Sequence, residues 1–322
     1  MTQALSMRQR CPGQSVIEEL LRLQADSPAR SALSRMFGRS PLTAAARSWY
    51  QGAKGEIAVG SLLTNLPPEW TVLHALPVGT RGSDIDHIVV GPGGVFTINT
   101  KHHKDKKVWV AKDTLLVDGA KKDYVRDAEF EARRVGKLIE KRMPLPAPVQ
   151  PILTFVSPAQ LMIREKPVQV KVLEAWQLNR WLTNLSHVFT EPEQDEITSI
   201  LEDPNTWAVV ASGTVASASA PASVDVLTSQ SAHGDARVTP TPADRVWTGD
   251  SALIPEDPDE SEAAGSEISV GLMAEFERLD AEVRSARTRR AGWNVAGYAL
   301  LVIAPVSALW ILGDMLTGAG GL

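Results

Sequence analysis

Three residues of types used in phosphate chemistry, Asp86, Asn99 and Lys101, lie in two β-rich runs on either side of a Gly-Pro-Gly-Gly turn. If the runs pair as a hairpin that is symmetric about this turn, Asp86 faces Asn99, with Cβ atoms about 4.5–5.5 Å apart. Asp84 then faces Lys101. Because side chains alternate along a strand, Asn99 and Lys101 share a face and Thr100 points away. We therefore expect an acid, an amide and an amine to converge on one side of the hairpin.

Such a group could support metal-assisted cleavage of a phosphodiester. A hard cation such as Mg²⁺ or Mn²⁺ takes oxygen ligands and lowers the pKa of a bound water. A neighbouring ammonium can orient that water or neutralise charge that develops on the phosphate. The alternative interpretation is a surface ion pair between Lys101 and either Asp84 or Asp86, because charged hairpin residues are usually only solvated.

A fourth candidate, Glu56, lies in a run that the sequence predicts to be helical. Gly52, Glu56 and Gly60 recur every four residues and so lie on one helix face. A glycine-lined face allows close contact with a sheet, and Glu56 would then point at that sheet. The alternative is an exposed helical glutamate.

A basic run begins at Lys101 and ends in an aromatic residue. Lysines can contact nucleic-acid phosphates, and an indole ring can stack on a base. The residues with these expected roles are Lys104, Lys106, Lys107 and Trp109. The alternative is a solvated turn. The sequence contains no GxxxxGK[ST], GxGxxG or GxSxG pattern, so no nucleotide cofactor is expected.

The segments that contain these residues resemble the nuclease-related domain (NERD) family. The resemblance is carried by Gly-Ala-Lys-Gly-Glu at 52–56, by the run 85–96 and by Asn-Thr-Lys at 99–101, and it extends over about 50–158. The family is assigned to the PD-(D/E)XK superfamily of restriction-endonuclease-like proteins. The resemblance implies an α/β fold in which helices flank a mixed sheet, and a nuclease that uses Mg²⁺ or Mn²⁺ on DNA or RNA.

In this resemblance, Asp86 corresponds to the metal-binding aspartate, Lys101 to the lysine of the motif and Glu56 to the helical glutamate. Asn99 stands at the position of the second acid. It supplies one neutral oxygen where the family pattern has a carboxylate, so a divalent cation should bind less tightly. The implied catalytic residues are Asp86, Lys101, Glu56 and Asn99, and the implied metal ligands are Asp86, Glu56, Asn99 and the Thr100 carbonyl.

The elements expected to position these residues form a folded part at about 44–212. Helical periodicity, β-rich runs and turn signals alternate along it, which indicates an α/β or α+β sheet with flanking helices. The expected helices are 44–65, 124–142, 178–182 and 194–201, and the expected strands are 71–77, 85–90, 95–101, 152–156 and 168–172, with a hairpin over 108–117.

The segments that flank this part differ from it in composition. Ser15 and Glu18 have the spacing of a capping box, so 1–43 is expected to hold a short helix and then a basic linker. Residues 213–270 contain ten acidic and two basic residues and no sustained apolar period, which predicts a disordered, self-repelling tether. Apolar residues at helical spacing in 271–290 predict an amphipathic helix, or else the beginning of the segment that follows.

The segment 291–313 contains 23 consecutive residues without a formal charge. About 20 such residues span a bilayer core, so one transmembrane helix is expected, followed by a short tail at 314–322. Four arginines lie within 284–290 and no basic residue follows the span, which predicts a cytoplasmic N-terminal part. Residues 1–20 contain no apolar run typical of a signal peptide. The sequence therefore predicts a single-pass membrane protein with a C-terminal anchor.

The whole sequence has 322 residues, of which 43% are hydrophobic and 22% charged, and a net charge of −5. These values exclude a wholly disordered chain and a multi-span membrane protein. Cys11 is the only cysteine, so an internal disulfide and a cysteine-based zinc site are excluded. The expected function is metal-dependent hydrolysis of nucleic acid at a membrane. The alternatives are a non-catalytic module that binds nucleic acid or protein there, and a scaffold that self-associates.

Overall fold

The computed structural model describes residues 7–28, 30–78, 84–143, 147–207 and 258–299. The chain divides into two compact units. The first unit comprises residues 1–14 and 51–269, and the second comprises residues 15–50 and 270–322. Both β-sheets belong to the first unit, and the described part of the second unit is helical.

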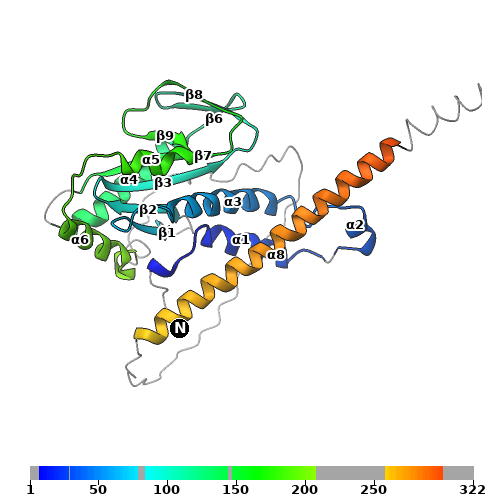
Figure 1. Ribbon diagram of the computed structural model, residues 1–322, viewed down its shortest axis with the longest axis horizontal. Coiled ribbons are helices and arrows are strands. Elements are labelled where there is room, and N and C mark those ends of the chain that lie inside the picture. Colours follow the sequence, from blue (N-terminus) through cyan, green and yellow to red (C-terminus); the bar gives the residue numbers. More distant parts are fainter. Residues whose placement is uncertain (1–6, 29, 79–83, 144–146, 208–257, 300–322) are drawn as a thin grey trace, which may run out of the picture. The chain divides into compact units, whose positions relative to one another are not determined.

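The central sheet of the first unit is mixed. Its five strands are β1 (Thr71–Pro77), β2 (Asp84–Gly91), β3 (Gly94–His102), β7 (Val149–Val156) and β9 (Lys171–Glu174). They lie in the order β1-β2-β3-β7-β9 (Figure 1). Strand β2 pairs antiparallel with β1 and β3, whereas β7 is parallel to both β3 and β9. A parallel pair requires a crossover connection, which contains helix α4 (Tyr124–Glu140) between β3 and β7.

Helices cover both faces of the central sheet. On one face, α3 (Ala46–Leu63) and α5 (Leu178–Thr183) contribute side chains to a core cluster around Ile98. On the other face, α4 and α6 (Glu191–Glu202) contribute to a cluster around Ile88. The sheet is therefore the middle of three layers, which confirms the expected mixed sheet with flanking helices.

A second sheet of four strands packs beside α4. Its strands are β4 (Lys107–Ala111), β5 (Thr114–Val117), β6 (Ala120–Lys122) and β8 (Gln160–Glu165), in the order β6-β5-β4-β8. Strands β4 and β8 are parallel, so this sheet is also mixed. Val110 and Leu115 face a core that includes Val125 of α4 and Phe155 of β7. The expected hairpin over 108–117 is confirmed as β4 and β5.

The β2–β3 hairpin has the register expected from the sequence. His87 pairs with Ile98, and the pairing continues to a two-residue turn formed by Pro92 and Gly93. Gly94 follows the turn with a φ of +135°, a conformation that side chains rarely adopt. The expected symmetric hairpin is therefore confirmed, although its turn lacks the Asn-Gly pair that is common in two-residue hairpin turns.

The second unit contains most of α1 (Gln14–Ala25), α2 (Ala32–Met36), the first turn of α3 and most of α8 (Pro258–Tyr298). Phe276, Leu279 and Val283 are buried along one face of α8, as the apolar spacing in 271–290 predicts. The same helix continues without a break to Tyr298, so it also agrees with the alternative that 271–290 is the beginning of the following segment. Tyr50 stacks on Phe276, with ring centroids 6.0 Å apart, and donates a hydrogen bond to Asp280. These contacts join the two distant segments of the unit.

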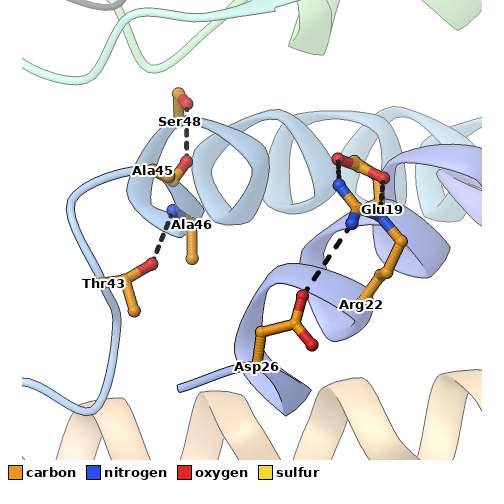
Figure 2. Close-up of polar contacts among 7 residues, drawn as sticks. All are labelled: Glu19, Arg22, Asp26, Thr43, Ala45, Ala46 and Ser48. Carbon is orange, nitrogen blue, oxygen red and sulfur yellow. Dashed lines mark hydrogen bonds and ion pairs between the residues drawn. The ribbon is translucent and has the colours of Figure 1, made fainter. Parts of the chain in front are cut away.

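Local hydrogen bonds stabilise the ends of these helices (Figure 2). The Ala46 N–H has no partner within α3, and it donates to Thr43 Oγ1 at 3.1 Å. In α1, Arg22 donates two hydrogen bonds to the Glu19 carboxylate, at 2.7 and 2.6 Å, and its guanidinium lies 3.9 Å from Asp26. The helix expected from residue 44 thus begins at Ala46, after its cap.

Two expectations for the flanking segments are wrong. α1 begins at Gln14, so Ser15 lies inside the helix and not at the N-cap position expected for it. Residues 258–270, expected to belong to the tether, form the start of α8. The rest of the expected tether, from 213 to 257, lies outside the described residues.

The expected membrane span, 291–313, is described only as far as residue 299. Its remainder and the tail at 314–322 lie outside the described residues. Within the ranges that the structure describes, no helix combines the length and the apolar character needed to cross a bilayer. The span therefore stays a prediction.

Candidate functional site

The hairpin brings Asp86 to the residues that the sequence places beside it. The pairing of His87 with Ile98 puts Asp86 opposite Asn99, at the end of the ladder. The Asp86 carboxylate accepts a hydrogen bond from the Thr100 N–H at 2.5 Å. The main chain of β3 therefore orients the carboxylate of β2, which is the arrangement expected from the hairpin register.

Glu131 of α4, which the sequence analysis missed, lies against Asn99. Asn99 Nδ2 donates a hydrogen bond to Glu131 Oε1 at 2.8 Å. The second oxygen of Glu131 is buried and has no hydrogen-bond partner among the described residues. Asn99 is 5% exposed, and its Oδ1 is also buried without such a partner. Glu131 thus supplies a carboxyl group next to the position where Asn99 lacks one.

The sequence does contain a signal for Glu131. Ala128, Ala132 and Val135 are buried on the inward face of α4. Glu131 is three residues after Ala128 and four before Val135, so it lies within the same apolar stripe. A charged residue inside an apolar stripe is seldom tolerated without a partner, and it is a candidate functional group.

Glu56 points into the first unit. It is 5% exposed, and its Oε2 is buried without a hydrogen-bond partner in the described part of the chain. The N-terminal segment closes over this face of α3: a Cβ added at Gly13 would lie 3.5 Å from Glu56 Cβ, and one added at Gly60 would collide with Pro12. The expected glycine-lined contact is therefore made with the N-terminal segment, and the alternative of an exposed glutamate is wrong.

Burial and mutual repulsion raise the pKa values of three carboxyl groups. Burial raises the pKa of Asp86 to about 6, although Lys101 opposes the change. Burial and then the charge of Asp86 raise the pKa of Glu131 to about 8. For Glu56, burial and then the charges of Asp86 and Asp84 raise the pKa well above its usual value. Glu56, Asp86, Glu131 and Lys101 therefore interact as one group, here named the acidic cluster.

Lys101 is the cation of the acidic cluster. Its Nζ lies 5.0 Å from the centroid of the Tyr124 ring, which is a cation–π distance. The Tyr124 ring stacks on His103, and the Tyr124 hydroxyl lies 3.2 Å from His103 Nε2. A ring face holds an ammonium without consuming its N–H donors, so Lys101 can still donate hydrogen bonds to a ligand.

The site and the strands that carry it fall within a known family. Residues 51–156 match the nuclease-related domain (NERD). The NERD region begins in α3, ends with β7 and contains the whole acidic cluster. This match confirms the resemblance seen in the sequence. No curated protein and no solved structure matches the chain.

The NERD region offers oxygen ligands to a cation. Glu56 Oε2, Asn99 Oδ1 and Glu131 Oε2 are the buried oxygens without partners noted above. A donor set made of oxygens, with more than one acid, suits a hard divalent cation better than a softer transition metal. Among the described residues, no three His, Cys, Asp or Glu side chains already stand in metal-binding positions. The donor chemistry fits Mg²⁺ or Mn²⁺.

Thr100 contributes to the cluster through its main chain. Its side chain lies on the face of β3 that α3 covers, where a Cβ added at Gly55 would be 3.4 Å from Thr100 Cγ2. Its N–H is the donor to Asp86, and in the ladder it pairs with Thr154 of β7. The structure thus gives Thr100 an orienting role, and the expected role of its carbonyl as a metal ligand stays a prediction.

The basic run lies beside the acidic cluster. Lys104, Lys106 and Lys107 are exposed. Burial, and then the positive charges of Lys106 and Lys101, lower the pKa of His103 to about 4. Charges act on His103 in this way only when they are near it, so Lys106 lies close enough to His103 to extend the positive field of Lys101.

Trp109 shares its face of the second sheet with Lys107, which lies two residues before it on β4. It is half-buried on the outer face of the second sheet, where it pairs with Leu116 of β5 and Met162 of β8. Its neighbours Val108 and Val110 face the core. No hydrogen bond, ion pair or ring contact in the described part of the chain links Trp109 to the acidic cluster. The expected base-stacking role of Trp109 stays a prediction.

Proposed function

We propose that the chain is a membrane-anchored NERD protein that hydrolyses phosphodiester bonds of nucleic acid with Mg²⁺ or Mn²⁺. The observation that carries the proposal is the acidic cluster, in which buried carboxyl oxygens without partners lie around one lysine. Such a cluster costs folding free energy, and a bound cation would offset that cost. The restriction-endonuclease-like character of the fold is part of the same proposal.

The proposed roles follow from the contacts of each residue. Asp86, Glu56 and the Asn99 amide oxygen hold the cation, with the Thr100 carbonyl as a further ligand. Glu131 orients Asn99 through their hydrogen bond. Because its pKa is about 8, it would supply negative charge once a bound cation or a higher pH removes its proton. When bound, the cation lowers the pKa of a water and offsets charge on the phosphate. Lys101 orients the attacking water or donates to a phosphate oxygen.

The basic run supplies the proposed nucleic-acid surface. Lys104, Lys106 and Lys107 are exposed, and Lys106 acts with Lys101 on His103. These lysines would contact backbone phosphates on either side of the scissile bond. Trp109 would stack on a base only if the nucleic acid continues onto the second sheet. DNA and RNA both present the phosphates that this surface would bind.

The proposed location is the cytoplasmic side of a membrane. The charge-free segment 291–313 would be the anchor, and the arginines that precede it would hold the N-terminal units on the cytoplasmic side. The partners of the chain would then be nucleic acid and the lipid bilayer.

The nuclease proposal is tested by cleavage assays on the full chain in an uncharged detergent, with DNA and RNA substrates. Cleavage should require Mg²⁺ or Mn²⁺ and stop when a chelator is added. Lys101→Ala should lower the rate at least about 100-fold, because it removes a charge that stabilises the transition state. Lys137→Ala, at an exposed position of α4, should cleave like the wild type. Equal cleavage by wild type and Lys101→Ala would contradict the mechanism.

Asn99 favours a second candidate, a module that binds nucleic acid or protein at the membrane without catalysis. It places a neutral amide where the family pattern has an acid. In the same assay the module would bind polynucleotide without a metal and would release it as salt rises, because counterion release drives such binding. Chelator-sensitive cleavage excludes the module.

A further inference from the structure

A cavity of about 480 Å³ in the second unit has a lining rich in arginine. Its polar lining consists of Arg30, Arg35, Glu282, Ser285 and Arg289, and the rest is small or apolar. The residues come from two segments, the loop and α2 on one side and α8 on the other. Three guanidinium groups and one carboxylate give the lining a net positive charge.

Existing contacts hold two of these arginines in place. Arg30 forms an ion pair with Glu282 and donates a hydrogen bond to the Arg39 carbonyl at 2.7 Å. Arg289 donates to the backbone carbonyl of Arg35 at 3.2 Å. A guanidinium has five N–H donors, so these contacts leave several donors for a ligand. The cavity is thus built of positioned side chains, and Arg30 is only 19% exposed.

The three arginines repel one another. Burial, and then the charges of Arg35 and Arg289, lower the pKa of Arg30. Glu282 is a single carboxylate and cannot neutralise all three guanidinium groups. An anion with several oxygens would complement the lining, because a guanidinium binds phosphate through pairs of hydrogen bonds.

The position of the cavity in the sequence suggests where such an anion comes from. Arg289 is two residues before the charge-free segment 291–313. With a rise of 1.5 Å per residue, this lining residue lies within about 3 Å of the start of that segment along the helix axis. If the segment spans the bilayer, the cavity lies at the level of the lipid headgroups, where basic residues attract anionic lipids.

We propose that the cavity lined by α2 and α8 binds the phosphate of an anionic phospholipid headgroup. Arg35 and Arg289 donate to the phosphate oxygens, and Arg30 is held beside them by Glu282. The inference rests on the proposed membrane anchor and is independent of nuclease activity. It gives the residues before the anchor a specific contact with lipid in addition to a general attraction.

The test is a calorimetric titration of the full chain in an uncharged detergent. The probes are dihexanoyl phosphatidylglycerol, dihexanoyl phosphatidylcholine and inorganic phosphate. Phosphatidylglycerol should bind more tightly than phosphatidylcholine. The double variant Arg35→Gln/Arg289→Gln should weaken its binding at least about tenfold, because hydrogen bonds between charged groups are lost. Arg287→Gln removes an exposed arginine of α8 that does not line the cavity, and it should bind like the wild type.

Three outcomes would overturn the proposal. Unchanged binding by the double variant would show that the cavity is not the site. If Arg287→Gln weakened phosphatidylglycerol binding as much as the double variant does, net charge alone would explain the binding. Binding of inorganic phosphate without phosphatidylglycerol would indicate a soluble anion in place of a lipid. An unchanged far-UV circular dichroism spectrum of the double variant would show that its helices are intact. Metal-dependent cleavage by the double variant should equal that of the wild type, which separates a failure here from a failure of the nuclease proposal, because the acidic cluster belongs to the first unit.

Discussion

At the scale of single residues, the hydrogen bond between Asn99 and Glu131 couples a strand to a helix. Asn99 has only one oxygen to offer, and its amide nitrogen is occupied by Glu131. This contact fixes which way the amide points, so Asn99 Oδ1 is directed away from Glu131. Replacing a residue that orients a metal ligand in this way usually weakens metal binding markedly.

Replacing Glu131 with Gln should therefore weaken the cation site. We expect the Mg²⁺ concentration for half-maximal cleavage to rise about 10- to 100-fold, because the variant loses a negative charge and a charged hydrogen-bond partner for Asn99.

The same variant, Glu131→Gln, should be more stable than the wild type near pH 8. The pKa of Glu131 rises from 4.5 to about 8 in the folded chain, so ionising it destabilises the fold as pH rises through this interval.

Metal titrations of cleavage and denaturant unfolding at pH 8 measure these two effects on the same sample. Glu140→Gln, at an exposed position of α4, is the matched control and should change neither. An unchanged Mg²⁺ dependence in Glu131→Gln would remove Glu131 from the site.

The sequence alone predicts that Asp86 and Asn99 belong to the site, but it does not predict Glu131. The difference has a physical reason. Asp86 and Asn99 lie on two strands that a two-residue turn connects. The alternation of side chains along a hairpin is therefore enough to predict that they face each other. Glu131 meets Asn99 only because α4 crosses the sheet between two parallel strands. The side on which a crossover helix packs depends on the whole core, which a local pattern does not encode.

At the scale of elements, strands β1 and β2 share a buried pair of histidines. His74 and His87 are paired in the ladder, and their Nδ1 atoms lie 2.8 Å apart. One ring must donate and the other accept, so the two rings cannot both be charged in this contact. Burial lowers the pKa of His74 to about 4, and burial and then His74 lower the pKa of His87 well below its usual value.

This pair should make the fold sensitive to acid. Above pH 6.5 both histidines are neutral in either state and contribute nothing. Between about pH 6.5 and 4 the unfolded chain takes up protons that the folded pair cannot, so the free energy of unfolding falls as pH falls. For His74 alone we expect a loss of about 2 kcal/mol between pH 7.5 and 5.

The difference between wild type and His74→Gln isolates this effect from the acidic cluster, whose raised pKa values act in the opposite direction. Denaturant unfolding at pH 7.5, 6 and 5 should show the advantage of the wild type shrinking as pH falls. His187→Gln, in an exposed loop, should follow the wild type at every pH. A constant difference would mean that His74 titrates normally in the folded chain.

The elements that the sequence predicts well are those with strong local patterns. Strand β1 is found at its expected bounds, and α3, α4 and α5 within a few residues of theirs. Strands β6 and β8 were missed because they are short or polar and lie at the edges of the second sheet, where one face is not buried. These two segments form strands because they pair with β5 and β4, and not because their own residues favour a strand.

At the scale of the whole molecule, the second unit joins parts of the chain that are far apart. Residues 15–50 and 270–322 belong to one unit, and Tyr50 contacts Phe276 and Asp280 across this separation. The amphipathic pattern in 271–290 predicts that a face of α8 is buried, but it does not say against what.

The anchor proposed for the chain makes a prediction at this scale. The full chain should stay in the membrane fraction after an alkaline wash, because a charge-free helix of this length is more stable in lipid than in water. A double substitution, Leu301→Arg and Ile303→Arg, should release it. Each arginine near the centre of a span costs about 2.5–3.5 kcal/mol, and two together exceed what the remaining apolar residues supply.

Matched positions outside the span and outside the cavity provide the control, since Ala281→Arg and Thr288→Arg add the same charge and should leave the chain in the membrane. Protease added to the outer side of sealed vesicles should leave the NERD region intact, because the basic residues before the span keep it on the cytoplasmic side. Release of the unmodified chain by the alkaline wash would remove the anchor, and with it the reason to expect the arginine-lined cavity at the lipid headgroups. The acidic cluster and its cation chemistry would stand unchanged, because none of its residues belongs to the second unit.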